Sequence, residues 1–127
     1  MRKLLLIGML LAGAASAGER FYAAPGTRIC PGDSVERKQF TFFLSRSHKC
    51  DLPIVNAEHM RALFFELGPV QRYGCWGELL GGDVALVYSD GQTDRMSLAT
   101  FVEVESNNGH YKAVSSPALD IGIIKCP

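Results

Sequence analysis

The sequence lacks the patterns that would assign it to a membrane, a metal or a redox reaction. Its apolar stretch, residues 4–14, is too short to span a bilayer as a helix. It has no Cys-x-x-Cys motif, which argues against a zinc knuckle or a thioredoxin-like pair. His48 with Asp51 offers at most two ligands, and His59 and His110 lie in unrelated segments. A zinc site needs three or four, so we expect no metal and no cofactor.

The first seventeen residues have the pattern of a bacterial-type export signal. Arg2 and Lys3 supply the positive start, residues 4–14 the apolar stretch, and 15–17 (Ala-Ser-Ala) the small-residue cleavage site. We expect residues 1–17 to be a signal peptide and residues 18–127 a single exported domain, periplasmic or secreted. Removing 17 of the 127 residues leaves 110, enough for one domain.

Neither sign of charge dominates the chain. The sequence holds 13 Lys and Arg against 13 Asp and Glu, and Arg2 and Lys3 would leave with the signal. The mature chain would then carry eleven basic and thirteen acidic residues, a net charge of −2. Because nucleic-acid affinity rests on many phosphate-neutralising cations, we expect no nucleic-acid partner. We also expect no stable membrane span in the mature form.

Four cysteines follow the expected cleavage site, and in an oxidising compartment they can form two disulfides. Four cysteines allow three connectivities, and the sequence does not decide among them. We favour Cys50 with Cys75 and Cys30 with Cys126, because the second pair would tie the ends of the chain together.

Most of the chain has the composition of strands separated by turns, which predicts a mainly β fold. Residues 18–35 are expected to be irregular, since they contain two Pro-Gly dipeptides. Residues 84–88 (Val-Ala-Leu-Val-Tyr) predict a central strand covered on both faces, and residues 97–100 one helical turn. The other expected strands are residues 39–45, 73–79, 93–96, 101–105 and 121–124.

Residues 56–67 fit two interpretations. Asn56 would cap a helix ended by Gly68 and Pro69, whereas a strand over 61–67 would use the same two residues as a tight turn. We favour the strand. The fold predicted is mainly β, or α+β with one short helix: a small antiparallel meander or an SH3-like, partly open barrel, stapled by disulfides.

The block 73–76 (Tyr-Gly-Cys-Trp), followed after a turn by residues 84–88 and then Asp90-Gly91, resembles a pattern in small exported proteins of bacteria and their phages. The resemblance covers roughly residues 50–101. It implies a β-rich fold and an exported location, and it implies no activity and no functional residues.

Residues 32–35 (Gly-Asp-Ser-Val) are similar to the nucleophile block of the GDSL esterases, with Ser34 as the nucleophile. In that family a downstream Asp-x-x-His supplies the base, and this sequence contains no Asp-x-x-His. A Pro-Gly-Asp-Ser turn explains the same residues. Two carboxylate pairs, Asp90 with Asp94 and Glu103 with Glu105, are expected to be solvated surface acids.

The polar stretch from Ser45 to Asp51 is the candidate binding loop. A disulfide at Cys50 would rigidify it, and a pre-ordered loop binds with less entropic loss. An ordinary solvated connection would have the same composition. Its candidate contact residues are Arg46, His48, Lys49 and Asp51.

Aromatic side chains are assigned to the core rather than to a ligand platform. Trp76, beside Cys75, is expected to be buried, and its indole N–H then needs a partner. The other core candidates are Phe42, Phe43, Phe64, Phe65 and Phe101.

These observations predict an exported, non-enzymatic binding or accessory domain with a protein or cell-envelope partner. The first alternative is an inhibitor of a cell-wall hydrolase or protease that acts through residues 45–51. The second is a small serine hydrolase that uses Ser34. The oligomeric state stays open.

Overall fold

A computed structural model describes residues 18–127 of the chain, and the expected signal peptide, residues 1–17, lies outside the described residues. The described part is mainly β, as predicted, with one short helix. Its strands are β1 (Glu19–Pro25), β2 (Ser34–Val35), β3 (Phe40–Lys49), β4 (Arg61–Leu67), β5 (Val70–Glu78), β6 (Asp83–Tyr88), β7 (Thr93–Ser97), β8 (Val102–Asn107) and β9 (His110–Ser115). The helical elements are the 3₁₀ turns η1 (Arg37–Gln39), η2 (Ala57–His59) and η3 (Leu98–Thr100), and the helix α1 (Pro117–Asp120).

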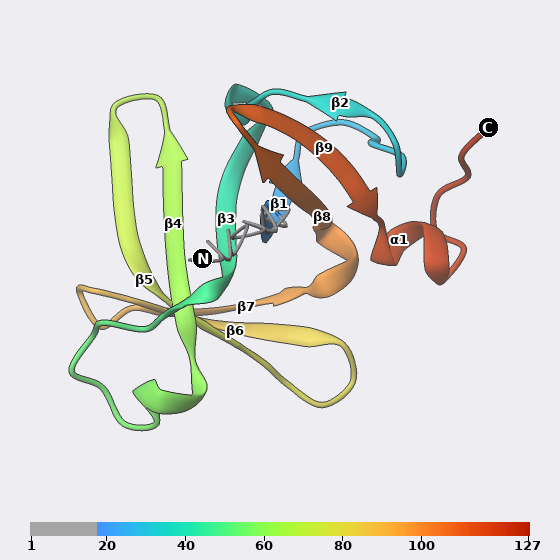
Figure 1. The fold of residues 1–127 in the computed structure, drawn as a ribbon. Helices are drawn as coiled ribbons and strands as arrows, with labels where there is room; N and C mark the ends of the chain where they lie inside the picture. The colour runs from blue at the N-terminus through green and yellow to red at the C-terminus, as the bar shows by residue number, and fades with distance from the viewer. Residues whose placement is uncertain (1–17) are drawn as a thin grey trace, which may run out of the picture.

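The nine strands form one open antiparallel sheet with the order β2-β9-β8-β1-β3-β4-β5-β6-β7. Strands β3 to β7 follow one another as a meander, in which the connection from β3 to β4, residues 50–60, is long and contains η2. Strand β1 lies between β3 and β8, so the first strand of the described residues joins the meander to the β8–β9 hairpin. In Figure 1 the sheet is strongly bent, with the β4–β5 hairpin upright and β6–β7 lying across its lower end.

The prediction that residues 18–35 are irregular is wrong for the first part of that segment. Residues 19–25 form β1, which pairs with β3 on one side and β8 on the other. Phe21 and Ala23 contribute to one face of the sheet, and Tyr22 and Ala24 to the other. The Pro-Gly dipeptide that suggested a turn marks only the end of the strand, at Pro25.

The ambiguous segment 56–67 contains a strand, as favoured from the sequence. Its first part forms η2, and β4 then runs from Arg61 to Leu67. Gly68, with a φ of +57°, and Pro69 make the tight turn into β5. A left-handed φ at this position suits glycine because it has no side chain to clash with the backbone.

Two shorter predicted elements, at residues 97–100 and 84–88, are present in the structure. The helical turn at residues 97–100 is confirmed as η3, capped by the Ser97 hydroxyl, which accepts from the Ala99 N–H at 3.2 Å. The strand over 84–88 is confirmed, but it is neither central nor covered on both faces. Strand β6 is next to the edge strand β7, and it buries only alternate residues, Val84, Leu86 and Tyr88.

The expected strand at residues 121–124 is wrong. The chain instead forms α1, begun by Ser116, whose hydroxyl accepts from the Leu119 N–H at 3.3 Å. Gly122, with a φ of +80°, then turns the chain away. Pro117 at the first helical turn favours this start, because a proline there loses no intrahelical hydrogen bond.

The two disulfides join Cys30 with Cys126 and Cys50 with Cys75, the pairing favoured from the sequence. The first ties the C-terminal segment to the chain after β1, and the second ties the end of β3 to β5. Two disulfides are consistent with a protein exported to an oxidising compartment. Within residues 18–127, no helix is long and apolar enough to cross a membrane.

Each face of the sheet carries its own apolar cluster. On one face the bent sheet brings side chains of β1, β3, β4, β5 and β6 together with Phe101, and all nine members of this closed core are buried. On the other face, Ile29, Val35 and Phe40 cover Ala23, Val102, Val104 and Ala113. Beside this second cluster the same face stays open, and it carries the site described next.

Candidate binding groove

Five aromatic rings form a row across the open face of the sheet. They come from five different strands: Tyr111 on β9, Phe21 on β1, Phe43 on β3, Phe64 on β4 and Tyr73 on β5. Neighbouring ring centroids are 5.2 to 6.1 Å apart, from Phe64–Tyr73 to Phe21–Tyr111, and no neighbouring pair is parallel. Tilted and edge-on contacts at these distances are favourable, because they bring ring edges near ring faces.

The aromatic row arises from pairs of adjacent aromatic residues in three strands. Phe21-Tyr22, Phe42-Phe43 and Phe64-Phe65 each place one ring on either side of the sheet, since successive residues of a strand point to opposite faces. Tyr22, Phe42 and Phe65 belong to the closed core or pack against it. The other member of each pair joins the row on the open face.

The aromatic row lines an open groove with a volume of about 420 Å³. Small-ligand sites have volumes of roughly 300–1,000 Å³ and are lined mainly by apolar and aromatic side chains with a few polar groups. Four of the five rings are half-buried, and Tyr73 is 59% exposed. The polar and charged residues that line the groove are Glu19, Arg20, Arg37, Ser45, His48, Asp51 and Ser106.

A guanidinium already lies on the aromatic row. The Arg37 side chain, from η1, places its Cζ 5.1 Å from the Phe43 ring centre and 5.5 Å from that of Phe64. Both distances are within the range of cation–π attraction. The same guanidinium lies 3.7 Å from the Glu66 carboxylate, at the limit of an ion pair.

The candidate binding loop, residues 45–51, is not a free loop for most of its length. Strand β3 continues to Lys49, with an irregularity in its pairing to β4 between Leu44 and Lys49. The Ser45 hydroxyl accepts from the backbone N–H of His48 at 2.9 Å and supports this bend. The expected connection therefore starts only at Cys50, because β3 is extended by its pairing with β1 and β4.

The structure separates the four candidate residues of this stretch. His48 and Asp51 line the groove, and Lys49 pairs in register with Arg61 of β4. Arg46 lies on the opposite face, where its guanidinium is 5.1 Å from the Tyr22 ring centre. A single contact surface made of all four side chains is therefore not present.

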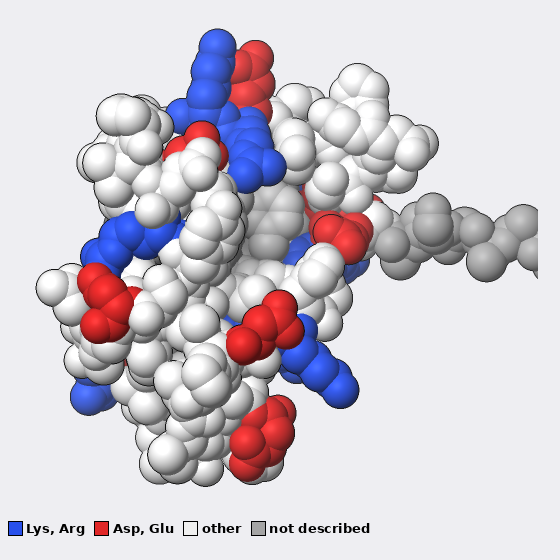
Figure 2. Space-filling view, turned by 90° about the vertical axis from the view of Figure 1, so that its left-hand side faces the viewer, with Lys and Arg blue, Asp and Glu red and all other residues white. Residues whose placement is uncertain are grey.

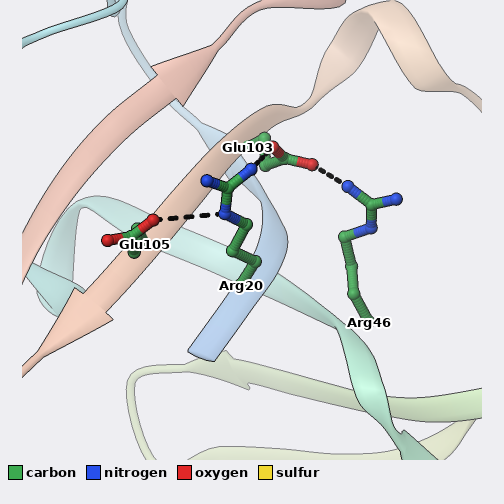
Figure 3. Close-up of polar contacts among 4 residues, drawn as sticks. All are labelled: Arg20, Arg46, Glu103 and Glu105. Atoms are coloured by element: carbon green, nitrogen blue, oxygen red, sulfur yellow. Dashed lines mark hydrogen bonds and ion pairs between the residues drawn. The ribbon is translucent and has the colours of Figure 1, made fainter. Parts of the chain in front are cut away.

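Arg46 belongs to a cluster of ion pairs on the closed face (Figure 3). It donates to one carboxylate oxygen of Glu103, and Arg20 donates to the other at 3.3 Å. The Arg20 Nε also donates to Glu105 at 3.1 Å. Glu103 is only 5% exposed, so the prediction that both acids are solvated is wrong for Glu103. A buried carboxylate needs such partners, because desolvation of an unpaired charge is costly.

Two tyrosines on the closed face are also paired with arginines. Burial raises the pKa of Tyr22, and the nearby Arg46 guanidinium partly opposes the rise. Burial likewise raises the pKa of Tyr88, whose ring centre lies 3.6 Å from the Arg72 guanidinium. Trp76 is 3% exposed, and its indole N–H donates to the Ser45 carbonyl at 2.8 Å, which supplies the partner that burial requires.

The residues around Ser34 form the turn expected as the alternative to an esterase motif. Asp33 accepts from the Cys30 N–H at 2.9 Å through its carboxylate, and its own N–H donates to the Cys30 carbonyl. Ser34, in β2, lies opposite Lys112 of β9 in the antiparallel pairing of these two strands. Among residues 18–127, the Ser34 hydroxyl has no hydrogen bond to a histidine.

Two of the three histidines lie near an acidic side chain. His48 is near Glu19, with 3.9 Å between Nε2 and the carboxylate, and His59 is near Glu58. Within the described part of the chain, no three His, Cys, Asp or Glu side chains are grouped so that they could hold a metal ion.

The face of the molecule that carries the β4–β5 hairpin is mainly uncharged (Figure 2). Small groups of Lys and Arg alternate there with groups of Asp and Glu, and neither sign forms a continuous patch.

Compared with known proteins, the chain matches no family model, no curated protein and no solved structure. The groove geometry is therefore the basis for a functional proposal.

Proposed function

We propose that this chain is an exported, non-enzymatic binding domain that takes its ligand in the aromatic groove. The observation that carries the proposal is the row of five rings lining an open groove of about 420 Å³. Soluble domains normally bury such rings, and exposed apolar surface bordered by polar groups is typical of interaction sites. The expected leader and the two disulfides support a location outside the cytosol.

The proposal is tested with the full chain, expressed with its own leader in an exporting bacterial host and purified oxidised. Binding is measured on a peptide array and on a glycan array, for the wild type and for Tyr73→Ala. Tyr73 is exposed and contacts the row through Phe64, so its removal should leave the fold intact and weaken binding about tenfold.

The matched control is Leu67→Ala. Leu67 is 61% exposed on the same hairpin but does not line the groove, so its loss should leave binding unchanged. If no ligand of either kind binds, or if Tyr73→Ala binds as tightly as the wild type, the groove is not the binding site.

The second candidate is the inhibitor of a cell-wall hydrolase or protease that acts through residues 45–51. It is favoured by His48, which is 62% exposed and lines the groove beside Asp51. Inhibition of such an enzyme that is lost in His48→Ala or Lys49→Glu, while Tyr73→Ala still inhibits, would support this candidate over the aromatic groove.

A further inference from the structure

We infer that the ligand of the groove is an extended, proline-rich polypeptide segment that carries an arginine or a lysine. This inference rests on the proposed function and specifies the class of ligand for the same site. Three features of the groove support it: the hydrogen bonding of its floor, the shape of its rings and the balance of charge on its rim.

Along the row from Phe21 to Tyr73, the floor of the groove offers a ligand no free strand edge. At these rings, strands β1, β3, β4 and β5 are each paired with a neighbour on both sides. A strand-like peptide laid on this face would bury N–H groups without partners, which is unfavourable. A proline-rich segment avoids that cost, because proline has no N–H and the polyproline II conformation keeps its backbone solvated.

The rings of the row suit proline side chains. Four of them are half-buried and Tyr73 is exposed, and all are tilted against their neighbours along one line, so they present a row of apolar ring surface to a ligand. Proline-rich segments pack into such aromatic-lined grooves and lose little conformational entropy, because their conformation is already restricted.

The charges on the rim favour a cation. The Arg20 charge is already paired with Glu103 and Glu105 on the other face. Among residues 18–127, Asp51 has no ion pair, and Glu19 has only the 3.9 Å approach of His48. Within the described residues, two carboxylates without a Lys or Arg partner therefore border the aromatic floor. A ligand cation would satisfy them and would also gain cation–π attraction.

Arg37 provides an internal example of the same contact. Its guanidinium lies over Phe43 and Phe64, which demonstrates that these ring faces accept a planar cation. A cationic ligand would be repelled by Arg37 and would compete with it for the two rings. Removal of this side chain is therefore expected to strengthen binding of the ligand, whereas loss of a rim carboxylate is expected to weaken it.

The test uses two short proline peptides, one with a central arginine and one with a central glutamate, and a neutral β-linked oligosaccharide. Affinity is measured by titration at low and at high salt. We expect the arginine peptide to bind, more weakly at high salt, and the glutamate peptide to bind at least about tenfold less tightly. Asp51→Asn and Glu19→Gln should each weaken the arginine peptide about threefold, since exposed ion pairs contribute little individually.

The variant that discriminates most sharply is Arg37→Gln, which should bind the arginine peptide about threefold more tightly. The control is Glu58→Gln, which removes an exposed acid outside the groove and should change nothing. Equal affinity for the two peptides, or weaker binding in Arg37→Gln, would overturn the inference. If the oligosaccharide binds and the peptides do not, the ligand class is wrong while the proposed groove is retained; if none of the array ligands binds, the proposed function itself fails.

Discussion

The two faces of the sheet use the same kinds of residue for different purposes. On the closed face, the bend of the sheet and the 3₁₀ turn η3 bring Phe101 over Leu44 and Leu86, and all three are fully buried. On the open face, Phe43 and Phe64 also pack against each other and against neighbouring rings, but they remain half-exposed. Aromatic composition alone therefore does not separate a core from a binding surface; the covering elements do.

This comparison is tested first by truncating one ring on each face. Phe101→Ala removes a fully buried ring and should lower the free energy of unfolding by about 3–5 kcal/mol. Phe64→Ala removes a half-buried ring and should cost about 1 kcal/mol, because less apolar surface is lost. Urea unfolding of the oxidised proteins measures both. Equal losses of unfolding free energy in the two variants would show that the rings of the open face stabilise the fold as core residues do.

A smaller effect is expected from the ion pairs of the closed face. Glu103→Gln removes a buried charge from between Arg20 and Arg46 and should lower the free energy of unfolding by about 1–2 kcal/mol. The figure is moderate because both arginine side chains remain partly exposed. Glu105→Gln, at the exposed end of the cluster, is the matched control and should cost a few tenths of a kcal/mol. Similar losses of unfolding free energy in the two variants would show that the burial of Glu103 does not add to the stability.

The smallest effect is a loss of stability at alkaline pH. Burial raises the pKa of Tyr22 in the folded protein above its ordinary value of 10.0. The folded state then holds this proton more tightly than the unfolded state, so its contribution is complete below pH 10 and is lost as the pH rises through the folded pKa. Tyr22→Phe should make the stability less dependent on pH in that range, as measured by urea unfolding at several pH values. An unchanged pH dependence in Tyr22→Phe would contradict this expectation.

The sequence predicted the features that depend on local patterns. The strand over residues 61–67, the helical turn η3 and the β-rich class follow from short stretches of the chain, and the disulfide pairing is the favoured one of the three that the sequence left open. Strand β1 was missed because the Pro-Gly dipeptides at 25–26 and 31–32 indicate turns, whereas they lie at the end of the strand and beyond it. Its extended conformation depends on β3 and β8, which lie much later in the chain.

The groove and the Glu103 cluster could not be predicted from local sequence. Phe21, Phe43 and Phe64 meet only because the order of the sheet places β1, β3 and β4 side by side. Arg46 and Glu103 are 57 residues apart in the chain. The doubled aromatics were a usable signal, since two adjacent rings in one strand must face opposite sides of the sheet. They indicated that both faces carry rings, but not which face stays open.

The open sheet leaves two strand edges that a second molecule could extend. One edge is β2, which has only two residues, and the other is β7, which carries Asp94 and Arg95. Short strands and charged side chains at an edge disfavour the pairing that leads to aggregation. The molecule can thus expose a hydrophobic groove while its borders resist growth into fibrils.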